Sequence, residues 1–254
     1  MKNLLTILLG LTTFIAEAHD FEIEGIYYDV ISIPNLTCEI VGGKPGLTNL
    51  TLPATIEVSD RTLKVVSINT EAWKGDQNIT SLVISDGIET IEKSAFSSCK
   101  NLSNVKLGNI QIIEDEAFYG CDNLKDITIP GSTTSIGNQS FATNQEAVET
   151  NLVFQYGIEN LSFGTDILIN RVLNTIDIDR DITQMGDQWN TTNETTIKWG
   201  PNATIFPSYF GKEITECDLS TTNIRIISDN AFSTKLENIK LPLNLLTSST
   251  CHPK

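Results

Sequence analysis

Apolar residues recur along the middle of the chain in a frame of 22 or 23 residues. The clearest unit opens with Leu102, Val105 and Leu107, which have the spacing L-x-x-L-x-L, and the same spacing occurs at 79–84 and 124–129. Side chains two positions apart share one side of a β-strand, so each unit contains a short strand with an apolar face. Such a strand can bury that face only beside the strand of the next unit, which predicts a stacked solenoid.

The second half of each unit carries an aromatic residue at a fixed position. Phe96, Phe118 and Phe141 occupy this position, and Trp73 occupies it in the unit before them. Apolar residues at helical offsets, preceded by acidic residues, predict about one turn of α-helix or 3₁₀-helix here. We expect each ring to point inward and to stack on the ring of the neighbouring unit.

The first 18 residues have the three parts of a secretory signal peptide. A lysine precedes an apolar run from Leu4 to Ile15, and Ala16-Glu17-Ala18 forms an A-x-A cleavage site. We therefore expect residues 1–18 to be removed, the mature chain to begin at His19, and a secreted or cell-surface location. The alternative is a buried N-terminal strand or helix. The run is shorter than the ~20 residues of a membrane span, and we expect no transmembrane segment in the mature chain.

Residues 19–68 have a different residue pattern from the repeats. Their β-branched and aromatic runs are broken by Gly and Pro, which predicts short strands and hairpins. A repeat stack needs a cap, because an open strand edge and apolar face would otherwise meet solvent. We interpret 19–68 as a β-rich N-terminal cap and 69–254 as the solenoid, degenerate around 142–175. Residues 244–254 either fold over the last strand or belong to a copy of a longer array that lacks its C-terminal cap or anchor.

The repeat pattern N-L-x-x-I-x-I-P…I-x-x-x-A-F-x-x-C resembles the BspA-like leucine-rich repeats of secreted and surface proteins of Bacteroidetes. The resemblance is close over 79–141 and again over 214–242. It implies an α/β repeat fold, a leucine-rich repeat solenoid of short parallel strands with short helical or 3₁₀ turns. It also implies adhesion to host matrix proteins or to other bacteria. The motif is specific to the repeat type and not to a ligand.

The chain is acidic, with 17 basic and 32 acidic residues and a formal net charge of −15. Nucleic acids and anionic membranes attract basic surfaces, and the sequence contains no basic cluster. We therefore expect no nucleic-acid partner. A length of 254 residues allows one extended solenoid or two small domains, and the continuity of the repeats favours one solenoid.

The five cysteines do not have the spacing of a metal site, since neither C-x-x-C nor paired histidines occur. Cys99 and Cys121 occupy the same repeat position, and Cys217 replaces a strand Leu or Ile. We interpret them as small buried apolar residues. A disulfide between Cys99 and Cys121 is the alternative, because an exported chain permits one.

No motif for catalysis or cofactor binding is present, and we expect neither a cofactor nor an enzyme. His19 and His252, the two histidines, lie at the ends of the mature chain, where neither would be held rigidly for Ser-His-Asp or Cys-His chemistry. Carboxylates such as Glu92 and Glu114 recur at equivalent positions, which favours a role in the repeat over a glycosidase pair.

A row of three carboxylates, Asp177, Asp179 and Asp181, alternates with isoleucines. Such a row could hold Ca²⁺ on one strand face. It does not match the EF-hand pattern, and a solvated strand face is the simpler interpretation.

Together these features predict a non-catalytic secreted or cell-surface module for protein binding or adhesion. The outward strand positions are mixed polar and lack the aromatic ladder that would favour carbohydrate stacking, so host or bacterial surface proteins are the expected partners. The alternatives are a structural repeat portion of a larger surface assembly and a glycan-active hydrolase, which would need two close, buried carboxylates. The candidate binding face consists of Ser81, Val83, Asn104, Lys106, Asp126, Thr128, Glu216, Asp218, Asn238 and Lys240.

Overall fold

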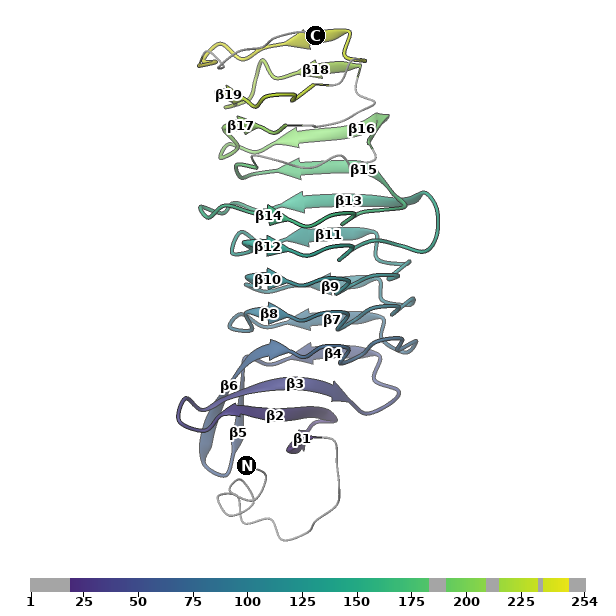
Figure 1. Ribbon diagram of the computed structural model, residues 1–254, viewed down its shortest axis with the longest axis vertical. Helices are drawn as coiled ribbons and strands as arrows, with labels where there is room; N and C mark the ends of the chain where they lie inside the picture. Colours follow the sequence, from purple (N-terminus) through teal and green to yellow (C-terminus); the bar gives the residue numbers. More distant parts are fainter. Residues whose placement is uncertain (1–18, 183–190, 209–214, 233–234, 247–254) are drawn as a thin grey trace.

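The computed structural model describes residues 19–182, 191–208, 215–232 and 235–246. These residues form a tall stack of short strands that lie across the long axis, with β1 and β20 at opposite ends of the stack (Figure 1). In chain order the strands are β1 (Phe21–Ile23), β2 (Ile26–Ser32), β3 (Thr37–Gly43), β4 (Asn49–Leu52), β5 (Thr55–Val58), β6 (Arg61–Ile68), β7 (Ser81–Ile84), β8 (Thr90–Ile91), β9 (Asn104–Lys106), β10 (Ile112–Ile113), β11 (Asp126–Ile129), β12 (Ser135–Ile136), β13 (Val148–Phe154), β14 (Ser162–Phe163), β15 (Arg171–Ile178), β16 (Thr191–Trp199), β17 (Ile205–Phe206), β18 (Glu216–Asp218), β19 (Ile226–Ile227) and β20 (Asn238–Lys240).

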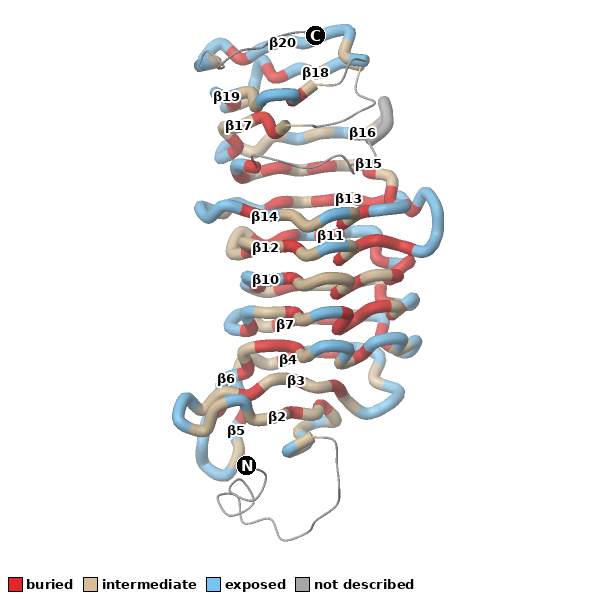
Figure 2. Tube along the Cα trace, viewed as in Figure 1, coloured by how far each residue is buried: buried red, intermediate tan, exposed pale blue. Residues whose placement is uncertain are grey.

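Two series of strands run along the stack. One sheet has the order β1-β2-β3-β6-β8-β10-β12-β14, with β5 paired to β6. The other series consists of the sheets β4-β7-β9, β11-β13-β15-β16 and β18-β20. Buried residues recur in the layers between β4 and β15 (Figure 2), as expected where every repeat covers its neighbour. The predicted leucine-rich repeat solenoid is therefore confirmed.

The antiparallel strand pairs occur near the N-terminus. The pairs β1–β2, β2–β3 and β5–β6 are antiparallel, whereas the remaining strand pairs of the described residues are parallel. Strand β4 already pairs in parallel with β7, so strands from the region 19–68 form part of the stack. The boundary of a separate cap at residue 68 stays a prediction.

An aromatic stack runs through the core, as the repeat frame predicted. The rings of Trp73, Phe96, Phe118 and Phe141 follow one another with centroids 5.4, 5.4 and 5.3 Å apart and with nearly parallel planes. All four side chains are buried. Parallel rings at this spacing maximise contact between neighbouring repeats, so the stack joins four repeats into one core.

The segments that carry these rings are not helical, and the prediction of short helical or 3₁₀ turns was wrong. No helix occurs among the described residues. The amide of Ala95 donates to the carbonyl of Glu92 within the turn (3.2 Å), but the amide of Phe96 donates to Ala117 of the next repeat (2.8 Å). Ser94 has a φ of 56°, which a right-handed helix cannot contain. The backbone thus shares its hydrogen bonds between its own turn and the next repeat.

The cysteines of the aromatic layer are buried thiols. Cys38, Cys99, Cys121 and Cys217 are all free, so the disulfide considered for Cys99 and Cys121 is not formed. The Cys99 thiol donates to the carbonyl of Trp73 at 3.1 Å, and burial raises the pKa of Cys99 to about 12. Cys38, Cys99 and Cys121 thus fill small apolar sites, Cys217 is partly buried, and all four thiols remain protonated at neutral pH.

The stretch in which the repeat frame blurs contains a fully buried arginine. Arg171 opens β15, and its guanidinium donates to the carbonyls of Leu124 (2.6 Å), Cys121 (3.2 Å) and Phe141 and to the Thr150 hydroxyl (3.0 Å). Burial lowers the pKa of Arg171 to about 10, so the group stays charged at neutral pH. It supplies donors to three carbonyls of neighbouring layers at the point where the strands lengthen and β13 carries a bulge.

Candidate binding face

Strand alternation places the candidate residues on the outside of the stack. In β7, Leu82 and Ile84 are buried and the residues between them face outward; β11 has the same pattern, with Ile127 and Ile129 buried. Ser81 and Val83 are partly buried, and the other eight candidate residues are exposed. The expected inward and outward sides are therefore the observed ones in β7 and β11, whereas in β20 the expected inward residue Ile239 is 37% exposed.

The ten residues form two groups rather than one continuous face. Ser81 and Val83 lie opposite Asn104 and Lys106 in the register of β7 and β9, and β11 follows them along the stack. The second group lies on β18 and β20, where Glu216 and Asp218 are paired with Asn238 and Lys240. Strands β13, β15 and β16 separate the two groups (Figure 1).

The first group lines an open depression of about 220 Å³. Its walls carry the ammonium of Lys106, the carboxylate of Asp126, the amide of Asn104 and the hydroxyl of Thr128, and Val83 adds an apolar patch. The depression lies where backbone pairing is interrupted, because β9 ends one sheet and β11 begins the next. We call this surface, lined by Ser81, Val83, Asn104, Lys106, Asp126 and Thr128, the seam site.

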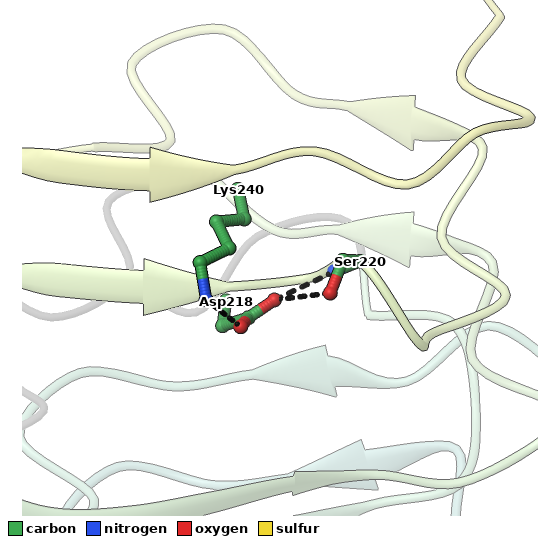
Figure 3. Close-up of polar contacts among 3 residues, drawn as sticks. All are labelled: Asp218, Ser220 and Lys240. Atoms are coloured by element: carbon green, nitrogen blue, oxygen red, sulfur yellow. Dashed lines mark hydrogen bonds and ion pairs between the residues drawn. The ribbon is translucent and has the colours of Figure 1, made fainter.

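The second group is largely occupied by its own contacts. The Lys240 ammonium lies 2.8 Å from the Asp218 carboxylate, and the Ser220 hydroxyl and amide also donate to Asp218 (Figure 3). The hydrogen bond from Lys240, followed by those from Ser220, holds the pKa of Asp218 well below its ordinary value. Within the described part of the chain, Lys106 of the seam site forms no such ion pair. The seam site thus presents the more available charge.

Sequence reasoning missed polar residues that extend the seam site. The side-chain amide of Asn151 in β13 donates to the Asp126 carboxylate at 2.7 Å, and the Asn151 side-chain oxygen accepts from Asn174 (3.1 Å) and Thr175 (2.9 Å) of β15. These residues fall in the stretch where the 22-residue spacing is lost. The alternation of apolar residues at Leu152 and Phe154 would have identified Asn151 as outward-facing.

The repeated carboxylates serve the backbone of neighbouring repeats. Glu92 accepts from the amide of Thr70 at 3.1 Å, and Glu114 accepts from the amide of Lys93 at 2.9 Å. Each carboxylate thus binds an amide in the preceding repeat. This arrangement explains why acidic residues recur at one position, and it supports the structural interpretation of these residues.

Two of the three aspartates considered for Ca²⁺ have a similar role. Asp179 accepts from the amide of Asn202 at 3.0 Å, and Asp181 accepts from the amide of Thr204 at 2.6 Å. In the described ranges, no group of three or more His, Cys, Asp or Glu residues is arranged to hold a metal ion.

The two histidines form no common site in the described structure. His19 stacks on Tyr27 with ring centroids 4.0 Å apart, and His252 lies outside the described residues.

The fold and this polar strand face define a leucine-rich repeat β-solenoid. The family model for the BspA type leucine rich repeat region matches residues 66–196 and 190–251, in six copies. The chain therefore belongs to the BspA-type leucine-rich repeat family.

Solved structures of similar fold come from bacteria. A leucine-rich repeat protein from Bacteroides ovatus is 21% identical, with a TM-score of 0.51; the match covers 91% of this chain and 55% of that one. A leucine-rich repeat protein from T. pallidum is 17% identical, with a TM-score of 0.54, and the match covers 74% of this chain and 84% of that one. At these identities the likeness shows the fold alone. Comparison with curated proteins gives no match. The described residues contain no helix long and apolar enough to cross a membrane.

Proposed function

We propose that the chain is a non-catalytic secreted or cell-surface module that binds proteins of the host or of other bacteria through the seam site. The observation that carries this proposal is the depression on the strand face, where a free ammonium, a carboxylate, an amide and hydroxyls surround an apolar patch. Proteins recognise each other through such mixtures of polar and apolar groups. Membership of a solenoid family supports the same proposal, because solenoids present extended surfaces for macromolecular recognition.

The frame in which these side chains sit also supports recognition. The inward residues must be apolar in every repeat, whereas the outward residues differ from repeat to repeat. A rigid strand stack holds variable side chains in place, so little ordering is needed on binding.

Export is the first requirement of this function. We expect cleavage after Ala18, so N-terminal sequencing of the protein collected outside the cells that make it should begin at His19. Residues 1–18 lie outside the described structure, and the prediction rests on the sequence. An extracellular form that began at Met1 would contradict it.

The seam site can be tested without changing the net charge of the protein. The exchange Lys106→Glu with Asp126→Lys inverts the two charges of the depression, and a partner complementary to the original pattern then meets like charges. We expect binding to weaken at least about tenfold. The measurement is biolayer interferometry of the mature protein against fibronectin, fibrinogen, collagen, mucin and intact bacterial cells.

The matched control is the exchange Lys100→Glu with Asp86→Lys, which inverts two exposed charges outside the seam site. It should bind as the wild type does. Circular dichroism should show that both exchanged proteins remain folded. If the seam exchange bound with unchanged affinity, the seam site would not be the binding surface.

A further inference from the structure

The connection after β13 is longer than its counterparts in the preceding repeats. The loops 85–89, 107–111 and 130–134 join β7 to β8, β9 to β10 and β11 to β12 with five residues each, whereas 155–161 joins β13 to β14 with seven. This loop projects beyond those of the preceding repeats at the left of Figure 1. In repeat proteins, insertions of this kind fall in loops on one face, which is often the binding face.

A buried arginine holds the long loop in place. Arg180 lies inside the stack, and its guanidinium donates to the Glu159 carbonyl (2.5 Å) in the loop and to the carbonyls of Thr133 (3.1 Å) and Gly131 (3.4 Å) in the preceding loop. One side chain thus joins the loops of two successive repeats. Hydrogen bonds from a charged donor are stronger than those from neutral groups, so this brace restrains the backbone firmly.

Two glycines bring the same loops into direct backbone contact. A Cβ atom on Gly131 would lie 1.6 Å from the Tyr156 carbonyl oxygen, and one on Gly157 would lie 2.1 Å from the Gly131 carbonyl oxygen. Only residues without a side chain allow this approach. The loop is therefore seated on its neighbour and ordered before any partner binds.

This ordered loop exposes two large apolar side chains. Tyr156 is 56% and Ile158 is 80% exposed, and within the described residues Tyr156 is the only strongly exposed large aromatic residue. In the shorter loops the isoleucines, Ile88 and Ile110, are buried. Most of the long loop is exposed (Figure 2). Exposure of these side chains costs hydration free energy that burial against a partner would recover.

We propose that Tyr156 and Ile158 form a second contact site, which inserts into an apolar pocket of the protein bound at the seam site. The inference rests on the proposed function. The position of the loop also supports a shared partner. The loop continues directly from β13, and Asn151 of β13 contacts Asp126 of the seam site. An exposed aromatic side chain on an ordered loop is typical of interface residues that carry much of the binding energy.

The charges around the loop define the chemistry of the pocket. Glu159 is exposed in the loop, Asp179 and Asp181 flank Arg180, and the guanidinium of Arg180 is buried. Acidic residues around the loop favour a partner whose pocket is rimmed by Lys or Arg, and they attract that partner before contact. A second copy of this chain, with its net charge of −15, or an anionic membrane would instead be repelled.

The test uses Tyr156→Ser with Ile158→Ser in the mature full-length protein and the same panel of matrix proteins, mucin and bacterial cells. We expect affinity to fall at least about tenfold, as for loss of central anchor residues. The control is Ile112→Ser, which removes an apolar side chain that is 39% exposed on β10 and should change affinity less than about twofold. Glu159→Lys should slow association at low salt, and the difference should shrink at high salt.

The outcomes separate this inference from the proposed function. If a panel member binds the wild type and the Tyr156→Ser, Ile158→Ser variant equally, the loop is not a contact site and the module still binds proteins. If no panel member binds the wild type, both proposals fail. Sedimentation with phosphatidylcholine vesicles tests whether the loop binds a lipid surface instead. Vesicle binding that the double variant loses would assign the loop to a lipid surface and overturn the protein partner.

Discussion

Replacement of Phe118 by alanine is expected to lower the free energy of unfolding by about 3–5 kcal/mol. Phe118 is fully buried, and its ring lies between those of Phe96 and Phe141 at 5.4 and 5.3 Å. Its removal deletes ring contacts on both sides and leaves a cavity in a close-packed core. Because each repeat depends on its neighbours, the loss should extend to the adjacent repeats.

The measurement for Phe118→Ala is equilibrium unfolding in urea, followed by circular dichroism. Ile112→Ala is the matched control, because this side chain is 39% exposed on a strand of the same stack, and it should lower stability clearly less than Phe118→Ala does. Limited proteolysis should cut the Phe118→Ala protein within the neighbouring repeats. A midpoint equal to that of the wild type would contradict the stacked arrangement.

Replacement of Arg171 by methionine is expected to cost about 3 kcal/mol or more. The substitution removes a buried charge, which by itself is favourable, since burial already lowers the pKa of this guanidinium to about 10. It also leaves the carbonyls of Leu124 and Phe141 without their donor, whereas the Cys121 carbonyl keeps the amide of Leu124 at 3.1 Å. Each buried carbonyl left unsatisfied costs roughly 1–3 kcal/mol, so two such losses outweigh the relief of the charge.

Urea unfolding at neutral pH measures this second effect as well. The exposed Arg61 provides the control, because Arg61→Met removes the same charge from the surface and should change stability by no more than about 0.5 kcal/mol. Unchanged or increased stability of Arg171→Met would mean that the cost of burying the charge exceeds the value of its hydrogen bonds.

The sequence alone determined the stack and its inner face. A 22-residue spacing of Phe96 and Phe118, with alternating apolar residues in each strand, leaves few ways to bury those side chains. It also predicted which strand residues face outward, because alternation in a strand follows from local geometry. The six residues of the seam site were identified in this way, although their function stays a proposal.

The conformation of the turns could not be read from the same pattern. Ile, Ala and Phe at helical offsets are compatible with a helix, but the amides of alternate residues instead bind the next repeat. This hydrogen-bond pattern requires a neighbouring repeat whose carbonyls lie opposite those amides. The sequence of a single repeat contains no information about that neighbour. The local propensity was therefore overridden by contacts between repeats.

The sites that break the repeat were decided by the tertiary structure. Arg171 and Arg180 are both buried, although the repeat pattern gives no indication of it, because each lies where carbonyls of neighbouring layers converge and need donors. The interruption between β9 and β11 and the seating of Gly157 on Gly131 are likewise contacts between successive repeats. Periodicity specifies what all repeats share, whereas these features arise from how particular neighbours fit together, and that fit is a property of the folded stack.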